Sequence, residues 1–435
     1  MREGRRLLLP LLLLVAAEPA LAQISLHDLP ALARARAERL RPAQEKALEP
    51  FWSDLSLDYR DNAQYLDQRI AQVATIGDSA VPILLEKLQP VAGNDKARSL
   101  AANSRRVLEK LDPASFLDAL VELARSNNEV ARVESIQLLG RSGSTRAVPV
   151  LMAVLDQANP GETMMILQAL TRLADPTPAD RIVRMLGSGD RTVRAAVLDY
   201  LVAAAPPVVL PTVLQSLPNE KERNVLPKYV QYFAAVAREN EAVAVALLPF
   251  LDREKLDYRD LLTMVEHLAV IAPKDHDPTK RKLLEWIDGG ETGSLALAAA
   301  TTLRTLGDKS GMKRLLLTIN EQLKRPQRRQ DPQLLEDRAN LHAANDDWKD
   351  AADDFEKVLE LSQSALLQRR IRGQLIRSEA HRSRWDRMLK HLKDSGLTLP
   401  EIEVLAADDA AVREGLSRPS IRSFLQTLAR DGTGR

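Results

Sequence analysis

Histidine is the side chain best suited to proton transfer or metal binding near neutral pH. The six histidines of this chain are scattered: His27, His267, His276, His342, His381 and His391. Only Asp275-His276-Asp277 forms a cluster whose side chains could attract a metal ion. Because Pro273 and Pro278 flank this cluster, we expect it to form a turn and a helix cap, and we predict no metal site.

The sequence also lacks the short motifs that accompany common catalytic sites. It contains no HExxH, GxxxxGKS/T, GxGxxG or GxSxG pattern. Ser395 and Ser417 have no evident base, and the absence of cysteine excludes a thiol nucleophile, a disulfide and a cysteine zinc site. We therefore predict a protein that is not an enzyme and has no cofactor. An enzyme whose catalytic site is assembled from scattered positions remains an alternative, ranked third after the two binding functions described below.

Charged side chains near the C-terminus alternate in sign along the chain. Residues 313–330 are mainly basic, residues 346–360 mainly acidic, and residues 369–393 mainly basic again. One interpretation is a set of solvated faces that pair with one another. The other is a charge-striped surface that recognises a partner. For this second interpretation the candidate partner-binding residues are Arg369, Arg370, Arg372 and Arg377.

Two matching intervals predict the elements that position these side chains. The segments RAVPVLMAVL and VVLPTVLQSL place Pro149 and Pro211 at the same point of one pattern, 211 − 149 = 62 residues apart. Arg132 and Arg194 keep the same interval, 194 − 132 = 62. Half of it, about 31 residues, lies in the range of stacked structural repeats. Two helices of this size cannot bury their apolar faces alone, so we expect helix pairs to stack into one core.

The segments AVPILLEKL, AVPVLMAVL and GDRTVRAAVLDYL resemble the HEAT repeat family. This resemblance implies an all-α fold in which helix pairs form a right-handed α-solenoid. In that family an aspartate of the inter-helix turn and an arginine of the second helix form a structural ladder, and Arg132, Asp190 and Arg194 match those positions. Helical spacing of apolar residues places Leu151 and Leu198 in the core.

A different pattern follows the polar segment RPQRRQD at residues 325–331, which we interpret as a junction. DDWKDAADDFEKVLEL resembles the second helix of a tetratricopeptide repeat, with Trp348, Ala351 and Phe355 at the family's aromatic, small and aromatic positions. In a second copy, Trp385 starts the second helix, 385 − 348 = 37 residues after Trp348. The resemblance implies that tetratricopeptide-like helical hairpins follow the solenoid.

The N-terminal sequence has the order of a secretory signal peptide. Arg5 and Arg6 belong to a basic start, residues 7–17 are apolar, and Ala20-Leu21-Ala22 forms a cleavage site before Gln23. The apolar run is too short to cross a bilayer. We therefore predict an exported protein in the periplasm or outside the cell, without a membrane span. An uncleaved anchor is the alternative.

The predicted organisation is a signal peptide (1–22), an N-terminal helical cap (23–65), a HEAT-like solenoid (66–324) and a tetratricopeptide-like region (332–435). The formal net charge of +1 gives no global attraction to nucleic acid, which is not the expected partner. We predict a non-catalytic scaffold that binds another protein or peptide on its concave face. The alternative is binding of an anionic envelope polymer by the basic C-terminal helices. Neither the partner's identity nor the oligomeric state follows from the sequence.

Overall fold

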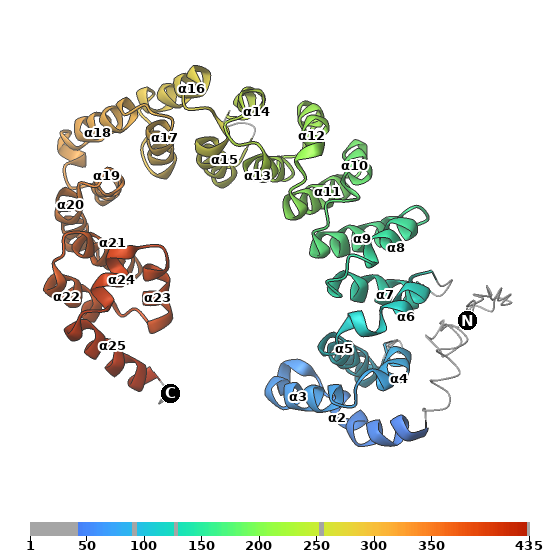
Figure 1. Cartoon of the computed structure of the whole chain (residues 1–435). Coiled ribbons are helices and arrows are strands. Elements are labelled where there is room, and N and C mark those ends of the chain that lie inside the picture. The colour runs from blue at the N-terminus through green and yellow to red at the C-terminus, as the bar shows by residue number, and fades with distance from the viewer. Residues whose placement is uncertain (1–41, 89–93, 126–128, 252–255, 433–435) are drawn as a thin grey trace, which may run out of the picture. The chain divides into compact units, whose positions relative to one another are not determined.

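A computed structural model describes residues 42–88, 94–125, 129–251 and 256–432 of the chain (Figure 1). Within these ranges the chain forms helices and turns and no strand, which confirms the predicted all-α class. The predicted signal peptide and residues 23–41 of the predicted cap lie outside the described residues. The chain divides into two compact units, Met1–Tyr232 and Phe233–Arg435, and each is described by itself.

The first unit contains α-helices of 4 to 16 residues. Its α-helices are α2 (Trp52–Leu55), α3 (Tyr59–Ala74), α4 (Val81–Glu86), α5 (Asp95–Lys110), α6 (Leu117–Ala124), α7 (Glu129–Arg141), α8 (Ala147–Leu155), α9 (Pro160–Leu173), α10 (Ala179–Ile182), α11 (Arg191–Ala204), α12 (Leu210–Ser216) and the start of α13 (Leu226–Val236).

Side chains at the helix starts explain where several of these helices begin. Asn94, Asn159 and Asp190 precede α5, α9 and α11, and each accepts a hydrogen bond from a backbone N–H of the first turn. Such a cap satisfies a donor that the helix itself leaves without a partner. Pro149 and Pro211 lie in the first turns of α8 and α12, where a missing N–H breaks no helical bond.

Consecutive helices of the first unit pack in pairs, and neighbouring pairs pack on each other. α6 contacts α7 and α8 contacts α9, while α7, α9 and α11 contact one another in succession. The predicted core residues Leu151 and Leu198 are both 0% exposed. Gly140 lies where α7 and α9 approach closely, because a Cβ added there would come within 2.6 Å of the Ala169 Cα.

Two buried tyrosines repeat one contact between neighbouring pairs. α9 and α11 both end at a residue in the left-handed conformation, Ala174 and Ala205. The Tyr200 hydroxyl donates to the carbonyl of Asp175, just after the first of these ends. The Tyr232 hydroxyl donates to the carbonyl of Pro206, just after the second, at 2.7 Å in both cases. The tyrosines lie 232 − 200 = 32 residues apart, close to the interval expected from the sequence.

The α-helices that begin in the second unit have 7 to 17 residues. After the end of α13 it comprises α14 (Glu241–Leu247), α15 (Tyr258–Ile271), α16 (Asp277–Asp288), α17 (Ser294–Thr305), α18 (Ser310–Leu323), α19 (Pro332–Ala344), α20 (Trp348–Leu361), α21 (Ala365–His381), α22 (Trp385–Ser395), α23 (Leu399–Ala407), α24 (Ala410–Leu416) and α25 (Pro419–Gly432). No helix in the described ranges is both long enough and apolar enough to cross a membrane.

Helices α19 to α22 contact one another in succession, and α18 packs against α19. The segment interpreted as a junction, residues 325–331, therefore lies inside the second unit, and the Arg338 guanidinium donates to the Asn320 side chain across it at 2.8 Å. Trp348 stacks on His381 with ring centroids 3.9 Å apart. The Arg418 guanidinium lies 4.7 Å from the centre of the Trp385 ring. Both tryptophans begin a helix and contact a residue 33 positions later (381 − 348 and 418 − 385).

Candidate functional site

A shallow groove of about 560 Å³ lies along α9 and α11 in the first unit. On α9 it is lined by residues at helical spacing, among them Met164, Gln168 and Arg172. On α11 the lining includes Ala195 and Val202 at similar spacing. Most of these side chains are uncharged and only partly buried. The groove can therefore take an apolar side chain of a ligand without displacing a side chain of the core.

The charged groups at the groove differ in how well they are paired. Arg172 is exposed and makes no ion pair within the described ranges. Arg191 is 3.6 Å from Glu222, and Asp199 pairs with Lys228. Arg172 is thus the cation best placed to meet an acidic group of a ligand at this groove.

Arginines also join one helix pair to the next in the first unit. Arg132 pairs with Glu162 at 2.8 Å, and Arg194 contacts Glu220 through two nitrogens at 2.8 and 2.9 Å. Burial tends to raise the pKa of Glu220, but the Arg194 contacts and backbone N–H groups outweigh it and hold that pKa below its usual value. Arg105 pairs with Glu134 in the same manner.

Asp190 has a different role from the one implied by the family resemblance. Its carboxylate accepts hydrogen bonds from the backbone N–H and the hydroxyl of Thr192, at 2.8 and 2.7 Å. The Thr192 hydroxyl holds the pKa of Asp190 below its usual range. The Arg194 guanidinium instead donates to the carbonyls of Ser188 and Gly189 and to Glu220. The acid in this ladder is therefore a glutamate of the following pair, which the sequence comparison did not single out.

The four arginines of the partner-binding hypothesis all lie on α21, and three of them have internal partners. Arg369 pairs with Glu401 at 2.5 Å, Arg370 with Glu336 at 2.9 Å, and Arg372 with Asp394 at 3.3 Å. Arg377 forms no ion pair within the described ranges, and its Nε is buried without a hydrogen-bond partner.

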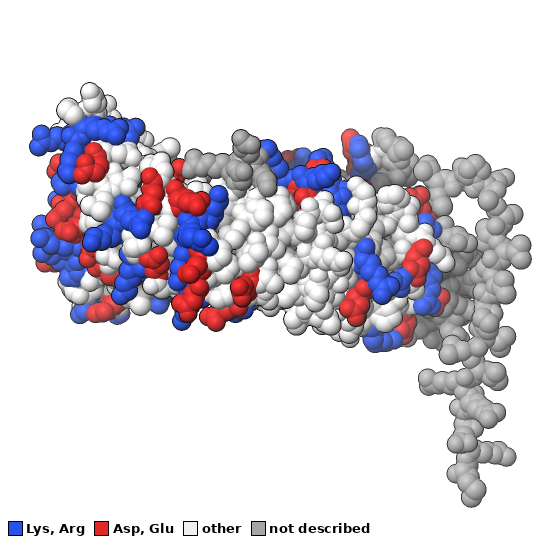
Figure 2. All heavy atoms as spheres, turned by 90° about the horizontal axis from the view of Figure 1, so that it is seen from above, with Lys and Arg blue, Asp and Glu red and all other residues white. Residues whose placement is uncertain are grey.

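In Figure 2, basic and acidic side chains lie next to each other where charged side chains gather on the displayed face, and the middle of that face is mostly uncharged. A chain of fixed anions would have to compete with internal carboxylates for Arg369, Arg370 and Arg372. No continuous unpaired basic surface supports binding of an anionic polymer in the described part of α21.

The cluster Asp275-His276-Asp277 lies at the start of α16. His276 occupies the N-cap position and its Nδ1 is 2.8 Å from the Thr279 hydroxyl. The Asp275 carboxylate is fully exposed and 4.0 Å from Lys280. The two aspartates and the histidine do not converge on a common point.

A second group of titratable side chains, which sequence reasoning missed, is assembled by α20, α21 and α22. Glu379 is 0% exposed, and burial raises its pKa. The Nη1 of Arg387 lies 3.2 Å from Glu356 and 3.6 Å from Glu379. Burial is the main cause that lowers the pKa of His391 to about 4, and the positive charge of the nearby Arg372 is the second cause. The His391 imidazole is therefore neutral at pH 7. These residues match no sequence motif, and only the packing of three helices brings them together.

No protein-family model matches this chain, and no curated protein matches it at a significant level. The site must therefore be interpreted from its own geometry.

Proposed function

We propose that this protein is a non-catalytic, exported scaffold that binds a segment of another protein in the groove along α9 and α11. In this proposal the helix pairs form a HEAT-like α-solenoid, and α19 to α22 form tetratricopeptide-like hairpins. The repeated inter-pair contacts of Tyr200 and Tyr232 support the first part. The two equivalent tryptophan contacts support the second.

One observation carries the binding proposal: a groove with a mostly uncharged lining has an exposed, unpaired arginine beside it. An apolar side chain of the partner would lie among Met164, Ala195 and Val202, and an acidic residue would meet Arg172. Apolar burial supplies most of the free energy in such contacts, while the charge selects the register. The partner is therefore a protein segment with an apolar residue close to an acidic one.

Site-specific photo-crosslinking in the producing cell tests this proposal. A photoreactive amino acid replaces Ala203, an exposed residue of the groove lining, or Val208, which is 69% exposed and outside the groove. We expect a defined adduct from position 203 and none from position 208. Mass spectrometry of the adduct should identify a segment with adjacent apolar and acidic residues.

The substitution Arg172→Glu provides the matched variant, because it reverses the charge at the groove without touching the core. We expect it to weaken the adduct at position 203 by about tenfold, as expected for an unfavourable charge at a recognition surface. Equal adducts from positions 203 and 208, or an adduct unaffected by R172E, would show that the groove is not the binding surface.

A further inference from the structure

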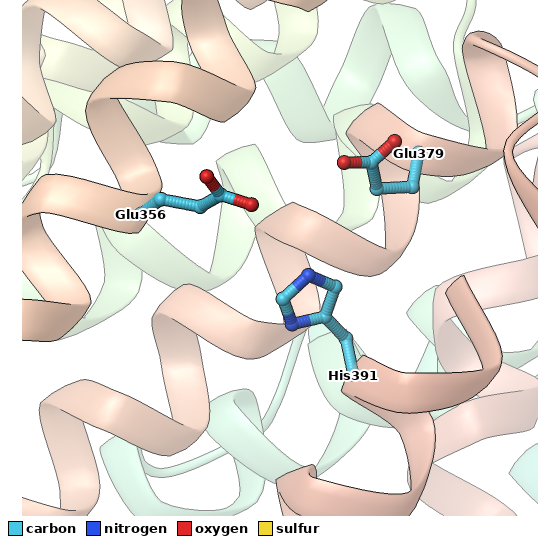
Figure 3. Close-up of side chains that lie close together, drawn as sticks. All are labelled: Glu356, Glu379 and His391. Atoms are coloured by element: carbon cyan, nitrogen blue, oxygen red, sulfur yellow. The ribbon is translucent and has the colours of Figure 1, made fainter. Parts of the chain in front are cut away.

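Three side chains from three consecutive helices of the second unit point towards one another. Glu356 comes from α20, Glu379 from α21 and His391 from α22, and Figure 3 shows the two carboxylates and the imidazole facing a common space. One donor atom from each of the three lies within 4.8 Å of the other two.

Each of two of these side chains has a buried polar atom without a hydrogen-bond partner. Glu379 is 0% exposed, and its Oε2 has no hydrogen-bond partner. His391 is 6% exposed, and its Nδ1 is buried without a hydrogen-bond partner. Buried polar groups without partners are uncommon in folded proteins, because each loses its bonds to water and gains none in return.

The cations around this group differ in how firmly they are held. Arg387 lies between the two carboxylates, but its side chain is 49% exposed, so its guanidinium can turn into the solvent. Arg382, 3.3 Å from Glu379, is 12% exposed and stays in place. Arg372 and Lys390 lie near His391 and Arg384 lies near Glu379, and these charges reduce the attraction for any added cation.

We propose that Glu356, Glu379 and His391 bind a divalent transition-metal ion of the zinc class, and that the ion displaces the guanidinium of Arg387. One imidazole nitrogen and two carboxylate oxygens form a donor set that Zn²⁺ accepts, with a fourth position left for water or for a side chain of a partner. Ca²⁺ requires six to eight oxygen ligands, which this group does not offer. The metal ion carries two positive charges and the guanidinium carries one, so the ion compensates the two carboxylates more completely.

Zinc titration of the purified full chain, after removal of metal with a chelator, tests the proposal. The competing probe is a chromogenic zinc indicator. We expect one tight equivalent of Zn²⁺ for the unmodified chain. Glu379→Gln and His391→Gln should each weaken it at least about tenfold, since even groups that only orient a metal ligand contribute that much. His267→Gln is the control, because His267 and the Thr263 carbonyl that it contacts both lie on α15 and not on α20, α21 or α22. This variant should leave the tight equivalent unchanged.

The variant Arg387→Gln gives a result that misfolding cannot imitate. Without the competing guanidinium, Zn²⁺ should bind roughly two- to fivefold more tightly, the range expected from the loss of a partly exposed ion pair. Co²⁺ in place of Zn²⁺ should give a visible ligand-field spectrum that H391Q abolishes. Weaker binding by R387Q, or a zinc equivalent that survives both E379Q and H391Q, would overturn the proposal. Loss of the tight zinc equivalent in H267Q would also overturn the proposal, because it would place the bound ion at His267.

Discussion

Two arginines on one helix show how burial decides the value of an ion pair. Arg194 and Glu220 have side chains that are 15% and 1% exposed. Arg191 and Glu222 are 62% and 42% exposed, and their charges are 3.6 Å apart. Loss of one partner from a buried pair leaves a charge without compensation, whereas an exposed pair competes with water and salt. The two arginines should therefore differ widely in their effect on stability.

We expect Arg194→Met to lower the free energy of unfolding by about 3–5 kcal/mol, because Glu220 remains buried and charged. Arg191→Met should cost less than about 1 kcal/mol. Urea denaturation of the purified variants measures both. The added change Glu220→Gln should restore part of the loss in R194M. Equal costs for the two single variants would show that burial does not distinguish these pairs.

The repeat interval in the sequence was sufficient to identify Arg132 and Arg194. It did not identify the acidic residues with which these arginines pair. The family resemblance directed attention to Asp190, which instead caps α11. Glu220 lies in a turn before α13, where no apolar periodicity marks its position. A search for an acid 26 to 30 residues after each arginine would have found it, because the two pairs span 26 and 30 residues.

The buried hydroxyl of Tyr232 should make the stability of the protein depend on pH in the alkaline range. Burial raises the pKa of Tyr232 from 10.0 to about 12. The folded state therefore holds the proton more tightly than the unfolded state, so this stabilisation is complete below pH 10 and is lost as the pH rises towards 12. The lost free energy is about 2–3 kcal/mol. Tyr232→Phe should be less stable than the unmodified chain at pH 8, and the difference should shrink between pH 10 and pH 12. Denaturant titrations at each pH provide the measurement; a constant difference would contradict the prediction.

At the scale of helices, close approach limits which residues fit between neighbours. Gly140 lies within α7, one residue before its end, where α9 packs against it. The helix can be predicted from the sequence, and a glycine near a helix end is usually interpreted as the residue that ends the helix. Only the packing of α7 on α9 shows that the missing side chain makes room for Ala169.

We expect Gly140→Ala to lower the free energy of unfolding by about 1–3 kcal/mol, because the new methyl group meets the backbone of Ala169. Gly373→Ala, within α21, is the matched control. Its methyl group would only reach ordinary van der Waals contact, 3.9 Å from the Leu405 side chain. That variant should change the stability by less than about 1 kcal/mol. Thermal unfolding followed by circular dichroism compares them; a stable G140A would mean that α7 and α9 can separate at no cost.

At the scale of the molecule, the charges nearly cancel, with 61 basic and 60 acidic side chains. Long-range attraction therefore adds little to recognition, and local chemistry must select a partner. The composition indicated this balance, and the helix-pair pattern indicated the all-α class. The metal-binding group and the groove could not be predicted, because both depend on which faces of successive helices meet.

Export is the prediction that concerns the whole chain. The basic start, short apolar run and Ala20-Leu21-Ala22 predict cleavage before Gln23. N-terminal sequencing of the protein recovered outside the cytoplasm should begin at Gln23. Replacement of Ala20 and Ala22 by bulky residues should leave the longer precursor at the membrane. A mature protein that retains Met1 would refute the prediction.

The tyrosine contacts have a mechanical consequence. If the chain is pulled from its C-terminal end, the bond from Tyr232 to Pro206 bears load before the bond from Tyr200 to Asp175. Each rupture frees about 32 residues, the spacing of the two tyrosines, and a segment of that length extends by about 11 nm when fully stretched. The part of the first unit that these two bonds hold should therefore lengthen under force in two successive steps of similar size.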